Sequence, residues 1–262
     1  SFDKVKYVHQ VNAGPAAARN RGAKEAQGQI FAFTDSDCVP HKNWLSQLVK
    51  GFKDSSIGVV MGSYGIANPQ YPLAYCVHQE IIFRHEKLLS DFPKVFGSYN
   101  FCVRKTVFEL VGGFDVSFRR ASGEDNDLSY KINAAGLKIY FERKALVDHY
   151  HPTQIRKYLR EQFHHGYWRV MMYFNHPKMV AGDGYTFWQD IIEIPFVCGC
   201  LVGLAFILFG FIGLKQLIVY YVLPFFIFEL CFAKVMLNNF KNDFFWGFIM
   251  FLRSFSRFFG LS

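Results

Sequence analysis

The segment IFAFTDSD, at residues 30–37, decides the fold class of this chain. Four apolar residues bounded by polar ones predict a short buried strand. Side chains alternate between the two faces of a strand, so we expect Asp35 and Asp37 to point the same way where the strand opens into a loop.

Two carboxylates this close repel each other and are stable together mainly when a cation lies between them. Mg²⁺ and Mn²⁺ prefer oxygen ligands and keep coordination sites for substrate phosphates. Asp35 and Asp37 therefore predict a metal–diphosphate site. The alternative is a solvated strand exit, because Asp and Ser favour turns for local reasons.

The segments around this strand alternate between strand-like and helix-like patterns. Residues 5–10 predict a strand, residues 15–26 a helix that begins at a proline, and residues 57–62 another strand. Alternation of this kind predicts an α/β sheet domain over residues 1–179, with ligands at the carboxyl ends of its strands. The two aspartates follow such an end.

A glycine-containing bend precedes a strand-like run at residues 101–103. It consists of Gly97, Ser98, Tyr99 and Asn100. A Tyr and an Asn beside a sheet end suit sugar hydroxyls, and an ordinary turn explains the same residues equally well.

Three acidic residues, Glu124, Asp125 and Asp127, begin a predicted helix that ends near Gly136. The helix dipole favours carboxylates in a first turn, which explains them without any chemistry. Three within four positions exceed what capping needs, so one of them is a candidate general base for an acceptor hydroxyl.

Two histidines, His149 and His151, follow a predicted strand at residues 145–147 and share one of its faces. They fit a polar strand exit. They also fit a third metal ligand, or a diphosphate contact, beside the two aspartates.

The C-terminal part is apolar enough to suggest a membrane. Residues 191–214 and 217–237 are each long enough to cross a bilayer, and the polar pair Lys215–Gln216 separates them. These two segments predict a helical hairpin in the membrane. The alternative is a pair of helices buried in the core of a soluble domain. We expect the membrane region to cover residues 190–262.

Two further helices are expected beside the hairpin. An amphipathic helix over residues 153–174 suits the membrane surface. A third apolar helix over residues 244–261 carries Arg253 and Arg257 on one face, which fits an interfacial helix or a tilted last span with its arginines near the headgroups.

The basic residues set the expected location. They lie before the first span and after the second, which predicts a multi-pass membrane protein with both ends, and the catalytic domain, on the cytoplasmic side. The net charge of +8 fits contact with anionic membrane lipid. We expect no nucleic-acid partner, because the basic residues cluster beside the spans.

Four motifs in order resemble the inverting glycosyltransferases of family 2. They are NAGPAAARNRG at residues 12–22, FTDSD at 33–37, GGFD at 112–115 and GED at 123–125. The resemblance covers roughly residues 5–170. It implies a GT-A-like (nucleotide-diphospho-sugar transferase) sheet domain, here followed by a membrane helical hairpin and a third apolar helix.

The resemblance also implies the chemistry. The donor would be a nucleotide-diphospho-sugar whose diphosphate is held through Mg²⁺ or Mn²⁺ by Asp35 and Asp37. Asp37 would be the more direct ligand, and His149 or His151 would be a further metal contact. Asp125, supported by Glu124, would deprotonate the acceptor hydroxyl for an in-line displacement with inversion. The acceptor would be a lipid-linked or cell-surface glycan.

The implied substrate-binding residues come from three of the segments already described. They are Arg19, Ser36, Gly97, Ser98, Tyr99 and Asn100.

Two departures from the family pattern bear on this assignment. The Gln-x-x-Arg-Trp motif of processive synthases does not occur after Gln162, which favours transfer of single sugars. The first strands, which hold the nucleoside in relatives, are missing, and we expect an N-terminally truncated sequence. The alternatives are a catalytically incomplete membrane scaffold of the same fold and a metal-dependent phosphotransferase.

Overall fold

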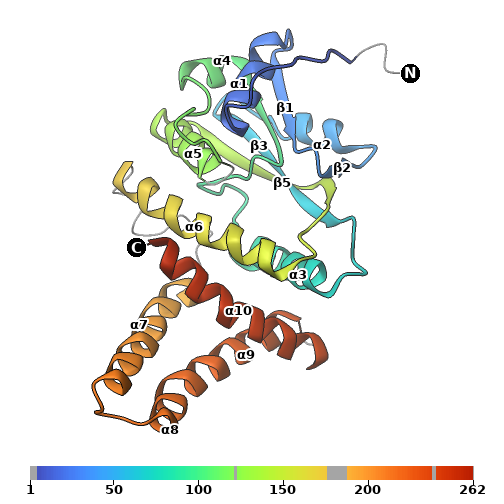
Figure 1. Ribbon diagram of the computed structural model, residues 1–262. Helices are drawn as coiled ribbons and strands as arrows, with labels where there is room; N and C mark the ends of the chain where they lie inside the picture. The colour runs from blue at the N-terminus through green and yellow to red at the C-terminus, as the bar shows by residue number, and fades with distance from the viewer. Residues whose placement is uncertain (1–4, 121–122, 176–187, 238–239, 262) are drawn as a thin grey trace. The chain divides into compact units, whose positions relative to one another are not determined.

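The computed structural model in Figure 1 describes residues 5–120, 123–175, 188–237 and 240–261. The chain forms two compact units. The first comprises Ser1–Ser36, Pro40–Ser63 and Asp91–Leu146, and the second comprises Asp37–Val39, Tyr64–Ser90 and Val147–Ser262. These units divide the chain differently from the boundary expected near residue 180.

The elements of the N-terminal half alternate between helix and strand. In chain order they are α1 (Pro15–Glu25), β1 (Ile30–Thr34), β2 (Cys38–Pro40), α2 (Trp44–Lys50), β3 (Ile57–Ile66), α3 (Pro72–Lys87), β4 (Asn100–Arg104), α4 (Lys105–Leu110), α5 (Glu124–Ala134) and β5 (Lys138–His149). The expected α/β alternation is present.

The elements that follow β5 are helical. They are α6 (Ile155–Asn175), α7 (Trp188–Leu208), α8 (Leu214–Leu217), the π-helix η2 (Ile218–Val222), α9 (Leu223–Leu237) and α10 (Phe240–Leu261).

The five strands form one sheet in the order β1-β4-β3-β5-β2. Strand β4 is antiparallel to both β1 and β3, and Ala32 pairs with Cys102 in the first of these ladders. Phe31 is buried while Ala32 is exposed, as the alternation of a strand requires. This register brings the end of β1, and with it Asp35, to the beginning of β4.

An aromatic cluster supports that end of β1. The Phe33 ring stacks on Phe101 at a centroid distance of 4.7 Å and meets Phe114 edge-on at 5.8 Å. Phe108 contacts both Phe33 and Phe114. Aromatic pairs of this geometry add to the stability gained from burial, so the strand end is a firm base for the residues that follow it.

The strand expected over residues 5–10 is wrong, because the structure has no strand there. Val5 is 69% exposed and Tyr7 is 84% exposed. An alternating pattern forms a strand only when one of its faces is buried, and this segment buries neither.

In the second unit, α6 and α10 lie side by side at unusually close range. A Cβ atom on Gly260 would lie 2.0 Å from the carbonyl oxygen of Phe163, and one on Gly166 would lie 2.1 Å from that of Arg257. Only glycine allows two helix backbones to approach this closely. The helix expected over residues 153–174 therefore packs on the third apolar helix.

Two helical segments of the described residues could cross a membrane by length and composition, Trp188–Leu208 and Leu214–Leu237. The turn between them is not at Lys215–Gln216 as expected, because those residues lie in α8. It falls at residues 209–213, where Gly210 adopts a φ of 76°. The Gln216 side chain instead accepts the N–H of Gly213 and caps α8.

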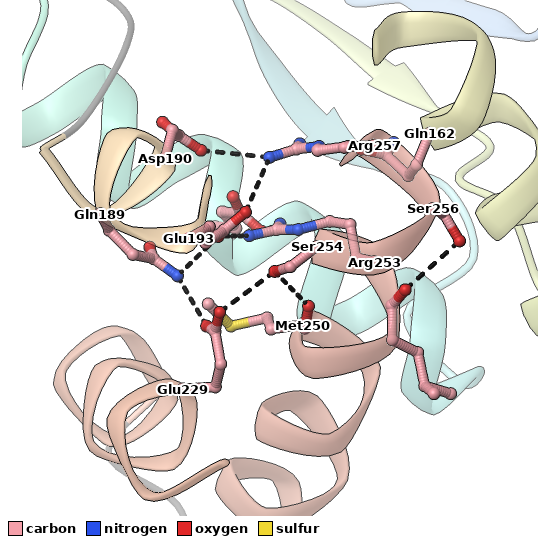
Figure 2. Close-up of polar contacts among 12 residues, drawn as sticks. Gln162, Gln189, Asp190, Glu193, Glu229, Met250, Arg253, Ser254, Ser256 and Arg257 are labelled. Carbon is pink, nitrogen blue, oxygen red and sulfur yellow. Dashed lines mark hydrogen bonds and ion pairs between the residues drawn. The ribbon is translucent and has the colours of Figure 1, made fainter. Parts of the chain in front are cut away.

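A buried network of charged side chains joins α3, α7 and α10. Figure 2 shows its α7 and α10 residues. Arg253 of α10 binds Glu80 at 2.6 Å and Glu193 at 3.1 Å. Arg84 of α3 binds both Glu80 and Asp190 at 2.8 Å. Burial alone would raise the pKa of Glu80, but Arg253 and Arg84 lower it by more, so that the pKa lies below its usual value.

The network extends to α9 and α6. Glu229 accepts hydrogen bonds from Gln189 at 2.8 Å and from Ser254 at 3.1 Å, and Arg257 donates to Gln162 at 2.8 Å. The α10 arginines therefore neutralise carboxylates inside the protein. The expectation that they lie near lipid headgroups is wrong for Arg253, whose side chain is fully buried.

Replacing Arg253 by Leu should strongly destabilise the second unit. The change leaves Glu80 and Glu193 buried with fewer partners, and removing one member of a buried ion pair costs about 3–5 kcal/mol. Thermal unfolding in detergent measures the effect. The matched control is Lys157→Ala, which removes an exposed pair with Glu161 and should cost at most about 0.5 kcal/mol. Equal effects of the two changes would contradict this account of the network.

Candidate active site

One guanidinium organises the acidic residues of the first unit. Arg19, on α1, binds Asp35 through Nη2 at 2.7 Å and Glu124 through Nη1 at 2.8 Å. Glu124 is almost fully buried at the start of α5. The ion pair compensates that burial, which would otherwise be costly for a carboxylate. Arg19 thereby links α1 to a residue 105 positions later in the sequence.

The neighbouring Asn20 fixes the helix that carries Arg19. Its amide donates to the carbonyl oxygen of Phe114 at 2.8 Å and accepts the N–H of Phe114 at 3.0 Å. The preceding Gly113 has a φ of 70°, a conformation that favours glycine. The two hydrogen bonds between Asn20 and Phe114 therefore join the NAGPAAARNRG and GGFD motifs.

The charge of Arg19 is secured by its partners. Burial of the guanidinium lowers its pKa, but the ion pairs and hydrogen bonds with Asp35 and Glu124 raise it by more, so that the pKa lies above its usual value. Arg19 is therefore a permanent cation beside the acidic residues of this site.

Asp125 lies next to Glu124 in the first turn of α5 and is the base candidate. Its Oδ2 accepts the N–H of Ser98 at 3.3 Å. Burial, followed by the charge of Glu124, raises the pKa of Asp125 to about 7, against the opposing effects of the Ser98 N–H and Arg19. A carboxyl group with such a pKa can take up a proton near neutral pH.

Asn100, the last residue of the bend at residues 97–100, has a structural role in place of the expected contact with sugar. Asn100 is fully buried; its Oδ1 accepts the indole N–H of Trp44 at 2.6 Å, and its Nδ2 donates to the carbonyl oxygens of Ser63 and Ala145 at 2.9 Å. These bonds occupy its amide. Asn100 therefore ties β4 to its surroundings, and the expectation that it binds substrate is wrong.

Among the other members of the bend, Ser98 contacts Asp125 and Tyr99 contacts β3. Ser98 supplies the backbone N–H, while Tyr99 is mostly buried and donates to the carbonyl oxygen of Gly62 at 3.5 Å. A Cβ atom on Gly97 would lie 2.2 Å from the Tyr99 ring. Ser36, after β1, is exposed, and its role in substrate binding stays a prediction.

The second unit contains a possible metal-binding group. Ligand atoms of Asp37, Cys38 and His149 all lie within 4.8 Å of one another. His149 Nε2 is 3.5 Å from Asp37 Oδ1. The Tyr150 N–H donates to the carbonyl oxygen of Asp37 at 2.9 Å and so holds the residue before β2 against the residue after β5.

His151 does not belong to this group of donor atoms. Its ring is 4% exposed, and its Nδ1 lies 3.2 Å from Nδ1 of His149. Burial, followed by the nearby His149 and His78, lowers the pKa of His151 to about 3. His151 therefore stays neutral and contacts the metal candidate His149 instead of supplying a ligand itself.

Asp35 and Asp37 have different partners in the structure, and their shared role as metal ligands stays a prediction. Strand β1 ends at Thr34, so the strand alternation does not extend through the following residues. Asp35 binds Arg19, whereas Asp37 faces His149. Only Asp37 lies in the group of candidate metal ligands found among the described residues.

Three contacts in these sites were missed by sequence reasoning. They involve Asn20, Asn68 and Tyr64. Asn20 lies inside a recognised motif, which was a usable signal. Asn68 and Tyr64 follow no motif, and their contacts depend on residues more than 80 positions away in sequence.

Residues 1–109 match the family model described as "Glycosyl transferase family 2". This part of the chain is therefore similar to the members of that family. The family match and the mixed sheet confirm the expected GT-A-like α/β fold class.

Two named glycosyltransferases are similar to about two thirds of the chain. The pre-mycofactocin glycosyltransferase of Mycobacterium tuberculosis is 30% identical over 179 residues, which cover 66% of this chain and 38% of the relative. Glycosyltransferase AglE of Haloferax volcanii is 27% identical over 175 residues, covering 66% of this chain and 56% of the relative. The chain thus spans between about two fifths and just over half of the length of these relatives.

Among solved structures, the mannosyltransferase PcManGT from Pyrobaculum calidifontis, in complex with GDP-Man and Mn²⁺, is similar at 20% identity with a TM-score of 0.45. The similarity covers 63% of this chain and 44% of that protein.

Replacing Asn100 by Ala should destabilise the first unit, because Trp44 and two carbonyl groups would lose their buried partner. A buried polar group left unsatisfied costs about 1–3 kcal/mol. Denaturant unfolding measures the effect. The control is Asn43→Ala, since Asn43 is exposed and its side chain makes no capping bond. A loss of activity at unchanged stability would instead restore Asn100 to the substrate site.

Proposed function

We propose that this chain forms part of a metal-dependent, inverting glycosyltransferase. It would move a sugar from a nucleotide-diphospho-sugar to the hydroxyl group of a lipid-linked or cell-surface glycan. The observation that carries this proposal is the position of Asp125, which accepts the N–H of Ser98 and lies next to the Glu124–Arg19 ion pair. The family match supports the reaction class.

Asp125 acts as the general base. It takes the proton of the acceptor hydroxyl while the hydroxyl oxygen attacks the anomeric carbon of the donor. The bond between that carbon and the diphosphate oxygen breaks, and the nucleoside diphosphate leaves with the bonding electron pair. Attack from the face opposite the leaving group inverts the anomeric carbon.

Glu124 and Arg19 hold the base in place. Glu124 is paired with Arg19 and so keeps α5 fixed at the residue before Asp125. The negative charge of Glu124 raises the pKa of Asp125, and the positive charge of Arg19 limits the rise. The three residues together set the proton affinity of the base near neutral pH.

Asp37 and His149 fit a divalent cation. Their ligand atoms lie within a span that one ion can bridge, and the partly exposed Asp37 leaves room for phosphate oxygens. A carboxylate and an imidazole are both ligands of Mn²⁺-type ions, whereas Mg²⁺ prefers oxygen. A bound Mg²⁺ or Mn²⁺ would neutralise the charge that develops on the departing diphosphate.

We also propose that the α7–α9 hairpin inserts into the membrane. Large apolar side chains are exposed around its turn, which suits contact with lipid. They are Leu208, Phe209, Phe211, Leu214 and Tyr220. A multi-pass arrangement with the sheet domain on the cytoplasmic side agrees with the positions of the basic residues. An acceptor carried by a lipid would then reach the enzyme from the bilayer.

Replacing Asp125 by Asn should lower turnover by about 100- to 10,000-fold, the usual contribution of a general base. The full-length protein is assayed with a panel of UDP- and GDP-sugars and Mn²⁺, following release of the nucleoside diphosphate together with the glycoside. The control Asp91→Asn changes an exposed surface pair with Arg143 and should leave turnover unchanged. Full turnover of Asp125→Asn would overturn the proposal, and absence of transfer by the wild type with every donor would favour the scaffold.

The pH dependence follows from the raised pKa of Asp125. The base works only when deprotonated, so kcat/KM should fall as the pH drops through about 7 and level off above it. A pH–rate profile of the wild type measures the inflection. An inflection near the ordinary carboxyl pKa, about 4, would contradict the assignment of Asp125.

A further inference from the structure

We propose that His151 is a positioning residue for the candidate metal ligand His149, and that Asn68 holds His151 in that role. The proposal rests on the proposed function in one respect, namely that His149 contacts the divalent cation. It assigns a role to two residues that do not themselves touch the cation.

Asn68 brackets the backbone of His151. The Asn68 side chain donates from Nδ2 to the His151 carbonyl oxygen at 2.8 Å and accepts the His151 N–H at Oδ1 at 3.1 Å. Both residues are 4% exposed. Buried hydrogen bonds of this kind have well-defined geometry, so the position of the His151 ring is set by a residue 83 positions earlier in the chain.

The contact between the two imidazoles determines their tautomers. Nδ1 of His149 and Nδ1 of His151 lie 3.2 Å apart, so one of these nitrogens donates a proton and the other accepts it. For Nε2 of His149 to offer its lone pair to a cation, the proton of that neutral ring must be on Nδ1. His151 Nδ1 is then the acceptor, and the His151 proton is on Nε2.

The geometry at the other end of His149 agrees with this assignment. Its Nε2 is the nitrogen that faces Asp37, at 3.5 Å from Oδ1. The Tyr64 ring meets the His149 ring nearly edge-on at 5.2 Å and also lies beside His151 at 5.7 Å. The His149 ring is therefore confined on two sides, with the metal-facing nitrogen directed at the carboxylate.

The buried side of His151 argues against a purely structural residue. Its Nε2 has no hydrogen-bond partner among the described residues. Leaving a buried polar group unsatisfied costs about 1–3 kcal/mol, which an apolar residue at this position would avoid. Among the described residues, the ring of His151 makes one polar contact, which is with His149. Positioning His149 accounts for a polar side chain at this place.

The test is Mn²⁺ binding to the full-length protein without any donor, measured from the EPR signal of free Mn²⁺. His151→Leu removes the acceptor and should weaken binding about tenfold, the usual effect of losing a partner of a metal-bound histidine. His151→Asn keeps an acceptor oxygen near the place of Nδ1 and should bind within about twofold of the wild type. A residue with only a packing role would not show this split.

Three results would count against the inference. Wild-type affinity of His151→Leu, or equal weakening by Leu and Asn, would overturn it. The reference variant His149→Ala separates it from the proposed function: unchanged Mn²⁺ affinity there would overturn the metal site itself, whereas weakening by His149→Ala without weakening by His151→Leu would overturn only the positioning role.

A measurement on the wild type avoids variants that fail to fold. With ¹⁵N-labelled histidine and saturating Zn²⁺, a diamagnetic ion that binds imidazole nitrogen, NMR should show the proton of His149 on Nδ1 and that of His151 on Nε2. A proton on Nε2 of His149 in the Zn²⁺-bound protein would overturn the inference.

Discussion

The ion pairs of Arg19 are the interaction on which the candidate active site depends. One guanidinium neutralises Asp35 after β1 and Glu124 at the start of α5, two segments that nothing in the local sequence brings together. Glu124 is nearly fully buried, so without Arg19 it would be an uncompensated charge. The position and proton affinity of Asp125, the next residue, follow from this arrangement.

In each unit, one asparagine side chain forms a pair of hydrogen bonds with the backbone of a distant residue. Asn20 accepts and donates a hydrogen bond with the backbone of Phe114, and Asn68 does the same with the backbone of His151. An amide group can satisfy both the N–H and the C=O of one residue, which makes it suited to fixing a loop. Each bracket lies beside a residue with a proposed chemical role, Arg19 in one unit and His149 in the other.

Much of the fold was predictable because its signals are local. The apolar run before Asp35, Pro15 at a helix start and the acidic first turn of α5 each predicted an element that the structure contains. The partners of the site residues were not predictable, since they depend on contacts between distant segments. Asn100 illustrates this: its sequence context fits a sugar pocket, but its amide is used entirely by Trp44 and two strand carbonyls.

The two aspartates have different roles in the proposed site. Asp35 is neutralised by Arg19, whereas Asp37 is available to a cation beside His149. Mn²⁺ affinity of Asp35→Asn and Asp37→Asn, compared by EPR on the full-length protein, tests this difference most directly. The account predicts that Asp37→Asn weakens binding at least about tenfold, as expected for loss of a ligand, while Asp35→Asn stays close to the wild type. Equal weakening by both substitutions would contradict it and restore the two aspartates to one metal-binding pair.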